Sequence, residues 1–226
     1  MAKATEEQVL DLPETLTKTE AYIEENKNSL SIIVTAIVII IGGYLFYSKY
    51  YVVNQEEEAR SQMYMAELYF KKDSLQKALN GDGQFPGFLS IIDDYGVTPS
   101  ANLAELYSGL SYLRLGQFQD AIGHLENFDS DDAILAPIAI GAMGDASLEL
   151  GNKEAALEYY LDAADKDDNT FTPAVYLMKA ALVQELLGKS ADALSTYERI
   201  KKDYPESREA QGIDKYIAKA TALAGK

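Results

Sequence analysis

Few side chains in this sequence are of the types that enzymes use for nucleophilic or metal chemistry. The chain has one histidine, His124, and no cysteine. A Ser-His-Asp triad, a Cys-His pair and a transition-metal site each need a fuller set of such groups. His124 stands three residues after Ala121 on an expected helix, so we predict a structural or solvent-facing role for it rather than that of a general base. The sequence predicts no enzyme, no cofactor and no metal site.

Three loop motifs contain residue types that bind ions or phosphates elsewhere. FDSDDA and DKDDN are rich in carboxylates, but neither has the twelve-residue loop with a central glycine and a final glutamate that binds calcium tightly. Weak calcium binding is the alternative to plain surface loops there. GDGQFPG lacks the GxGxxG spacing and follows no expected strand, so it is interpreted as a turn.

The charge balance excludes one class of partner. The chain has 36 acidic and 20 basic residues, and such a surface does not suit phosphate-rich nucleic acid. The acidic excess is local, because residues 120–168 hold 13 acidic and 2 basic side chains, whereas residues 169–226 hold 7 acidic and 9 basic ones. This asymmetry is either a binding feature or a solvated face.

A four-point pattern repeats three times in the C-terminal part of the chain. Each copy has a small residue, a glycine seven places later, an alanine five places after that, and a large apolar residue four places further on. The three copies are Gly109, Gly116, Ala121 and Leu125; Gly144, Gly151, Ala156 and Tyr160; Ala181, Gly188, Ala193 and Tyr197.

This spacing predicts a series of helical hairpins. The small residue and the alanine allow two antiparallel helices to approach closely, and the glycine ends the first helix between them. The period, 35 and then 37 residues, lies close to the 34 of the tetratricopeptide repeat. The pattern departs from that repeat at Glu105, Ile140 and Leu177, where a tryptophan is usual, and at Ala133 and Asp168, where a proline is usual.

Elements before and after the three copies extend the same arrangement. Ala66 and Ala78 keep the twelve-residue spacing of a fourth, damaged copy, whose second helix is interrupted by NGDGQFPG before it resumes as FLSIIDDY. Thr98-Pro99 and Thr172-Pro173 predict capped helix starts near 99 and 173. After Pro205 the sequence predicts a terminal helix that covers the last repeat, with an apolar stripe of Ile213, Tyr216, Ile217 and Ala220.

An apolar segment near the N-terminus predicts a membrane span. No charged side chain lies between Lys27 and Lys49, and a helix over residues 28–48, at about 1.5 Å per residue, matches a hydrocarbon core of about 30 Å. A cleaved signal would have a shorter apolar region and a small-residue cleavage site. We therefore expect a retained anchor over residues 28–51, with a buried core helix of a soluble protein as the alternative.

The composition of the span predicts how it contacts lipid and other helices. Tyrosines gather at its C-terminal end, at positions 44, 47, 50 and 51, where aromatic rings favour the headgroup layer. Its small residues, Ala36, Gly42 and Gly43, are candidates for close packing against another membrane helix. Basic residues on its two sides balance, so the charge rule leaves the orientation undecided.

Taken as a whole, the chain resembles the YfgM family, which are single-span ancillary subunits of the bacterial SecYEG translocon. The resemblance rests on the order TEAYIEENKNSL, apolar span, EEEARSQMYMAELYF and repeat units, and on GFLSIIDDYGVTPSANLAELYSGLSYLRLGQFQDAI and NTFTPAVYLMKAALVQELLG. It implies a bacterial inner-membrane location, a cytoplasmic N-terminus, a periplasmic repeat domain, and partnership with the translocon and a PpiD-like membrane-anchored chaperone.

The sequence therefore predicts an all-α protein with one N-terminal transmembrane helix followed by a tetratricopeptide-repeat-like α-solenoid. Its parts are a cytoplasmic tail (1–27), an anchor (28–51) and a periplasmic repeat domain (54–226). We expect it to bind a chaperone or an emerging polypeptide through the first helix of each hairpin. Candidate contacts are Arg114, Asp145, Glu149, Met178 and Glu185. The alternatives are a general envelope scaffold without a translocon link and a holdase chaperone acting alone.

Overall fold

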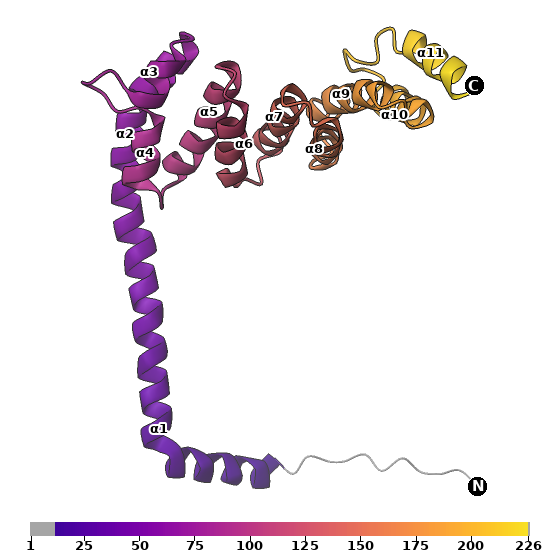
Figure 1. The fold of residues 1–226 in the computed structure, drawn as a ribbon. Coiled ribbons are helices and arrows are strands. Elements are labelled where there is room, and N and C mark those ends of the chain that lie inside the picture. The colour runs from indigo at the N-terminus through magenta and orange to yellow at the C-terminus, as the bar shows by residue number, and fades with distance from the viewer. Residues whose placement is uncertain (1–11, 226) are drawn as a thin grey trace, which may run out of the picture. The chain divides into compact units, whose positions relative to one another are not determined.

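The structure, a computed structural model, describes residues 12–225 of the chain, with side chains from residue 20 onward. Every regular element over these residues is a helix, which confirms the predicted all-α fold. The chain divides into two compact units, Met1–Val53 and Asn54–Lys226. Figure 1 shows the elements of both. The first part of the expected tail, residues 1–11, lies outside the described residues.

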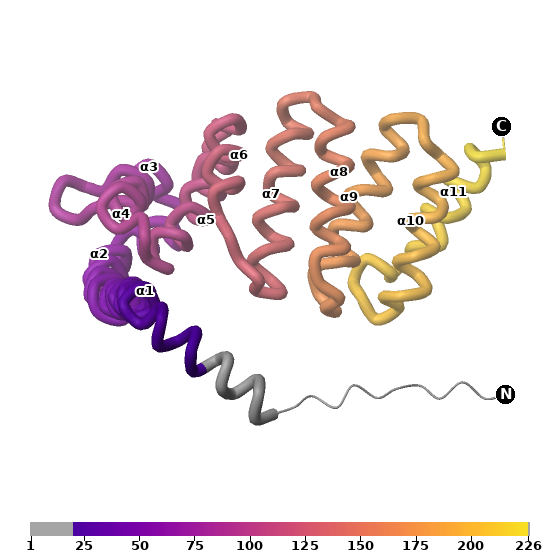
Figure 2. Tube along the Cα trace, turned by 90° about the horizontal axis from the view of Figure 1, so that it is seen from below, coloured from indigo at the N-terminus to yellow at the C-terminus, as the bar shows by residue number. Residues whose placement is uncertain are grey.

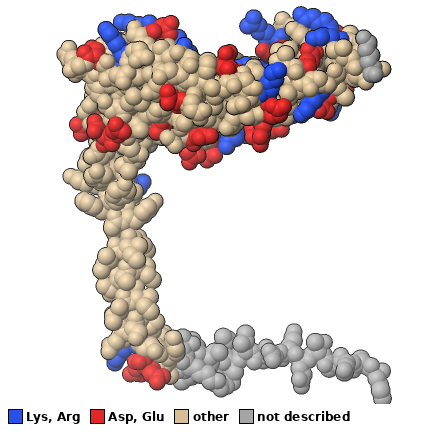
Figure 3. Space-filling model, in the orientation of Figure 1, with Lys and Arg blue, Asp and Glu red and all other residues tan. Residues whose placement is uncertain are grey.

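The first unit is built on the apolar helix. α1 (Leu12–Phe46) contains the predicted span and continues into a π-helical turn, η1 (Tyr47–Tyr51). Large apolar side chains from Ile32 to Leu45 are about half exposed or more, and Figure 3 shows them as a column of uncharged atoms. In the part of the chain that the structure describes, this is the one helix long and apolar enough to cross a membrane.

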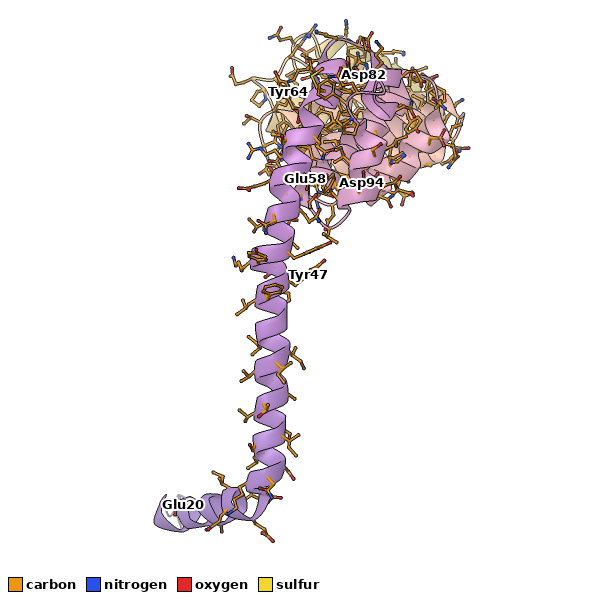
Figure 4. All side chains as sticks on the ribbon, turned by 90° about the vertical axis from the view of Figure 1, so that its left-hand side faces the viewer. Glu20, Tyr47, Glu58, Tyr64, Asp82 and Asp94 are labelled. Carbon is orange, nitrogen blue, oxygen red and sulfur yellow. The ribbon has the colours of Figure 1, made fainter. Side chains whose placement is uncertain are left out.

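Aromatic rings are paired at the C-terminal end of this helix. Phe46 stacks on Tyr50 with ring centroids 5.4 Å apart, and Tyr47 stacks on Tyr51 at 5.5 Å. These side chains project from the helix surface, as the labelled Tyr47 shows in Figure 4. Stacked tyrosines of this kind suit the headgroup layer of a bilayer, where the ring is in an apolar environment and the hydroxyl is hydrated.

The second unit is a series of antiparallel helical hairpins. The first contains α2 (Val52–Lys71), α3 (Leu75–Asn80) and α4 (Phe88–Tyr95). The next three are α5 (Pro99–Arg114) with α6 (Phe118–Asn127), α7 (Leu135–Glu149) with α8 (Lys153–Asp165), and α9 (Thr172–Leu186) with α10 (Ser190–Asp203). α11 (Asp214–Ala224) follows. Figure 2 shows these hairpins side by side in chain order.

The glycine and alanine positions act as the spacing predicts. Gly116, Gly151 and Gly188 have φ of 76°, 82° and 73°, which is the left-handed conformation that ends a helix at little cost for glycine. The three alanines of the pattern are fully buried, and the large residues that follow are at most 1% exposed. The predicted register of the repeats is therefore confirmed.

The small residue of each copy permits close helix approach. A Cβ at Gly144 would lie 2.7 Å from the ring of Tyr160, and one at Gly109 would lie 2.5 Å from Cγ of Leu125. Both distances are shorter than carbon atoms tolerate, so each second helix packs its large side chain directly over the backbone of the first. The glycine thus sets the spacing of the hairpin.

The first hairpin contains the predicted interruption. Its second helix is split into α3 and α4 by the loop from Gly81 to Gly87. The carboxylate of Asp82 accepts hydrogen bonds from the Tyr69 hydroxyl (2.5 Å) and from the backbone N–H of Phe85 (2.8 Å). The Tyr69 bond, with the backbone bonds, lowers the pKa of Asp82 to about 2. GDGQFPG is therefore a turn, as predicted, and the structure adds that its aspartate organises it.

Both predicted helix starts are confirmed, but only one of the two predicted threonine caps is right. The Thr98 hydroxyl accepts a hydrogen bond from the backbone N–H of Ala101 (3.1 Å), which caps α5 as expected. α9 instead begins at Thr172 itself. There the side-chain oxygen of Asn169 accepts from the backbone N–H groups of Phe171 and Thr172, both at 2.8 Å. The asparagine takes the capping role because its carbonyl reaches both free donors.

The predicted terminal helix is present as α11. Ile213, Tyr216, Ile217 and Ala220 belong to the apolar core shared with α9 and α10. The Tyr216 ring lies 5.3 Å from that of Tyr197, which is fully buried on α10. α11 therefore covers the apolar side of the last complete hairpin, as a terminal helix of a solenoid must.

Candidate protein-interaction surface

A pocket of about 490 Å³ opens on the solenoid between the end of α5 and the end of α7. Three of the five predicted contact residues, Arg114, Asp145 and Glu149, line it. The rest of its lining is mostly apolar and consists of Leu113, Gly116, Phe118, Leu148 and Tyr160. We call these eight residues the polar pocket. The first helices of neighbouring hairpins thus bring the three predicted charged residues together.

Arg114 is already engaged by the preceding hairpin. Its Nη2 lies 2.5 Å from Oδ1 of Asp73, and its guanidinium lies 5.2 Å from the ring centroid of Phe70. Both side chains of the ion pair are largely exposed, so the attraction is weak in water. Arg114 therefore presents a positive charge that is partly compensated.

Asp145 is the centre of a hydrogen-bond network. Its two carboxylate oxygens lie 2.6 and 2.8 Å from Nζ of Lys179, and Oδ1 also accepts a bond of 2.7 Å from the Tyr160 hydroxyl. Burial, together with the bond to Asp145, raises the pKa of Tyr160, so this phenol remains a donor. Burial likewise raises the pKa of Tyr176 to about 12. Asp145 is a structural group as well as a surface charge.

The other three predicted contacts lie in different environments. Glu149 is exposed, and within residues 20–225 its carboxylate has no ion-pair or hydrogen-bond partner. Met178 is half-buried against the core under α9. Glu185 is only 12% exposed, and its Oε2 lies 2.6 Å from Nζ of Lys219 on α11. Met178 and Glu185 line no part of the polar pocket.

A second hollow contains the predicted contact Glu185, but its leucines were not predicted from the sequence. It has a volume of about 360 Å³ and lies between α9 and α11, where Leu182, Leu186 and Leu223 surround the Glu185–Lys219 pair. We call these five residues the leucine groove. The three leucines are 41%, 60% and 43% exposed. The sequence contained a signal for these leucines. Leu182 and Leu186 stand one and five residues after Ala181, and Asp145 and Glu149 stand at the same places after Gly144 in the preceding hairpin.

The predicted packing residues of the span lie on an uncovered helix. Gly42 and Gly43 have no heavy atom near enough to meet an added Cβ, and Ala36 is exposed on the same helix. Their role in contacting a second membrane helix stays a prediction.

The histidine and the acidic loops have structural contacts. His124 Nδ1 lies 2.5 Å from Oε2 of Glu105, and its ring stacks on Tyr112 at 5.2 Å. In the FDSDDA loop, Asp132 accepts from the backbone N–H of Leu135 (2.8 Å) at the start of α7, and this lowers the pKa of Asp132. No group of three His, Asp or Glu side chains among the described residues is arranged to hold a metal ion.

Comparison with known proteins agrees with this architecture. The family model for the tetratricopeptide repeat matches residues 176–207, which run from α9 to just beyond α10. This segment is therefore similar to a tetratricopeptide repeat. The four-point pattern places the α5/α6 and α7/α8 hairpins in the same register, so they are tetratricopeptide-like units. No curated protein matches the sequence at a significant level.

A solved structure shares the tetratricopeptide-like fold. It is the crystal structure of nearly identical TPR-like repeats from a Podosopora anserina protein described as a kinesin light chain, with a TM-score of 0.55. The similarity covers 75% of this chain and 88% of the other, at 16% sequence identity. At that identity the likeness concerns the fold alone. Solenoids built from such helical repeats present extended surfaces that are suited to binding other proteins.

Proposed function

We propose that the protein is a membrane-anchored interaction subunit of the bacterial inner membrane, associated with the SecYEG translocon and a PpiD-like chaperone. In this proposal the N-terminus is cytoplasmic, and the repeats lie in the periplasm, where they help to handle emerging polypeptides. The observation that carries the proposal is the order of parts, in which one apolar helix directly precedes a tetratricopeptide-repeat unit. The resemblance to the YfgM family supplies the named partners.

The tethered arrangement supports a role in recruitment. A span that contacts one membrane partner raises the effective concentration of the repeats for a second partner nearby, so neither contact needs high affinity alone. The pockets between first helices supply polar and apolar binding groups in one unit.

Protease accessibility and purification test the proposal in two steps. Protease added to spheroplasts should degrade the repeat unit, and its protection would place the repeats in the cytoplasm and reject this function. Purification in mild detergent should then recover the translocon and the chaperone. Recovery of other envelope proteins without the translocon would favour a general scaffold instead.

A further inference from the structure

Repeat positions that are charged on α7 are occupied by leucine on α9. The positions one and five places after the small residue of each copy are Leu110 and Arg114 on α5, Asp145 and Glu149 on α7, and Leu182 and Leu186 on α9. The chemistry of this face therefore changes along the solenoid, from mixed on α5 and charged on α7 to apolar on α9. The polar pocket lies at the charged end and the leucine groove at the apolar end.

One ion pair links α7 to α9 beside the polar pocket, and a second links α9 to α11 inside the leucine groove. Lys179 of α9 contacts Asp145 of α7, and Lys219 of α11 contacts Glu185 of α9. Leu182 follows Lys179 by three residues and Leu223 follows Lys219 by four, so each leucine lies on the same side of its helix as the lysine. The face thus runs from α7 over α9 to α11.

Most charges on this face have partners within the chain. Arg114 is paired with Asp73, Asp145 with Lys179, and Glu185 with Lys219. Glu149 alone among the acidic residues lining the two hollows has no ion-pair partner in the described part of the chain.

Apolar side chains surround this carboxylate. Leu113, Leu148 and Phe118 line the same pocket as Glu149. A carboxylate with apolar neighbours suits a lysine or arginine, whose aliphatic stem needs apolar cover.

The leucine groove offers no uncompensated charge and a cluster of exposed apolar side chains. Single exposed leucines are ordinary on protein surfaces, whereas apolar side chains that gather in one patch can form an interaction site. Since the Glu185–Lys219 pair in the groove is already neutral as a whole, the groove favours apolar side chains over charged ones.

We propose that this face binds a partner polypeptide segment in which a lysine or arginine contacts Glu149 and nearby apolar side chains fill the leucine groove. Neighbouring packed helices lie about 8–10 Å apart and an extended chain advances about 3.3 Å per residue. The cation and the apolar residues are therefore separated by about three to six residues. This inference rests on the proposed protein-binding function and assigns the chemical class of its ligand.

A peptide selection tests the assignment without knowledge of the natural partner. The full-length protein in lipid nanodiscs is used to select from a phage-displayed library of random dodecapeptides, after depletion on empty nanodiscs. The expected consensus contains a basic residue and, about three to six residues away, at least two large apolar residues. Affinities of the selected peptides are then measured by fluorescence anisotropy.

Variants of the protein connect the consensus to this face. The double change Leu182→Ser and Leu186→Ser should weaken binding by about tenfold or more, because apolar anchors carry much of the affinity of such contacts. Glu149→Lys should also weaken it, and a peptide with its basic residue replaced by glutamate should regain binding to that variant. Matched controls are Val97→Ser and Glu158→Lys, which alter an exposed valine and an exposed carboxylate away from both hollows. Both controls should bind as the unaltered protein does.

Several outcomes overturn the assignment. These are the absence of an enriched consensus, an acidic consensus, and equal binding by the double leucine variant when its circular dichroism melt is unchanged. A loss of binding together with a collapsed melt also counts against it, because both leucines are exposed and should not be needed for folding. If the double variant binds the selected peptides as before and still purifies with the translocon and the chaperone, the proposed function stands and this face is not the site.

Discussion

Asp145 of α7 and Lys179 of α9 are 34 residues apart in sequence, and their charged groups lie 2.6 Å apart. The same separation joins Glu185 to Lys219 and Asp165 to Arg199, each at 2.6 Å. This separation is close to the repeat periods of 35 and 37 residues, so each pair links a helix to the corresponding helix of the next repeat. These contacts supplement the apolar cores through which successive hairpins pack.

The network at Asp145 predicts unequal costs for its members. Asp145→Ala should destabilise the folded protein by about 1–3 kcal/mol, because the buried Tyr160 hydroxyl loses its acceptor. Lys179→Met should cost about 1 kcal/mol or less, since both charges are about one third exposed and the Tyr160 bond is kept. Urea denaturation measures both values. Adding Tyr160→Phe to Asp145→Ala should recover part of the lost stability, because no hydroxyl is then left without an acceptor. A larger loss of stability for Lys179→Met than for Asp145→Ala would contradict this interpretation.

Gly141 predicts a packing limit between α7 and α9. A Cβ at this position would overlap the ring of Tyr176, which is 8% exposed. Gly141→Ala should therefore destabilise the protein by about 1–3 kcal/mol through overpacking. Gly123→Ala on α6 is the matched control, because nothing lies within 4 Å of its added Cβ. That control should raise stability by about 0.5–1 kcal/mol.

Thermal melts of the two variants give the comparison directly. They should shift in opposite directions although the chemical change is identical. Similar shifts would mean that α7 and α9 are not packed through Gly141.

Asp73 occupies the position at which the other three hairpins have glycine, and its φ is 58°. Asp73→Gly and Asp73→Ala both remove the ion pair with Arg114, so their difference isolates the backbone conformation. Alanine disfavours this left-handed region, and we expect Asp73→Ala to be less stable than Asp73→Gly by about 1 kcal/mol. Urea midpoints of the two variants test it. Equal midpoints would show that residue 73 does not end α2 in this conformation.

The hairpins could be predicted from the sequence because their determinants are local. Gly116 ends one helix and Ala121 packs in the next, so the spacing between them is enough to predict the turn and the two helices that it joins. The same register also contained Leu182 and Leu186, at the positions of Asp145 and Glu149. The choice of Met178 on the third repeat did not follow that register.

Other features depend on contacts that spacing does not reveal. Glu185 is largely covered because Lys219 of α11 pairs with it. The position of α11 depends on the non-helical segment between the end of α10 at Asp203 and the start of α11 at Asp214. Asn169 caps α9 because the preceding loop bends back toward two free N–H groups. Both depend on loop conformation, which carries no periodic pattern.

Buried tyrosines predict a loss of stability at high pH. Burial raises the pKa of Tyr176 to about 12 from its ordinary value of 10.0. The unfolded chain releases this proton first, so the stabilisation from the neutral buried phenol is present below pH 10 and is lost as the pH rises toward 12. Tyr176→Phe should reduce the slope of the free energy of unfolding against pH in this range. Urea denaturation at several pH values between 9 and 12 measures it, with the exposed Tyr64→Phe as control.

The apolar span and the repeat unit should each be needed for a different contact, the span for the translocon and the repeats for the peptide. Ala36, Gly42 and Gly43 leave the helix surface open to close contact, and helix association in lipid depends on such contact. Replacing residues 29–48 with an unrelated apolar span should weaken co-purification with the translocon and leave peptide binding by the repeats unchanged. Glu149→Lys should instead weaken peptide binding and leave co-purification with the translocon unchanged. We choose Glu149 and not Asp145 for this test because Asp145 also supports folding through its bond to Tyr160. Equal recovery of the translocon by the replaced span would show that the repeats alone recruit the protein to it.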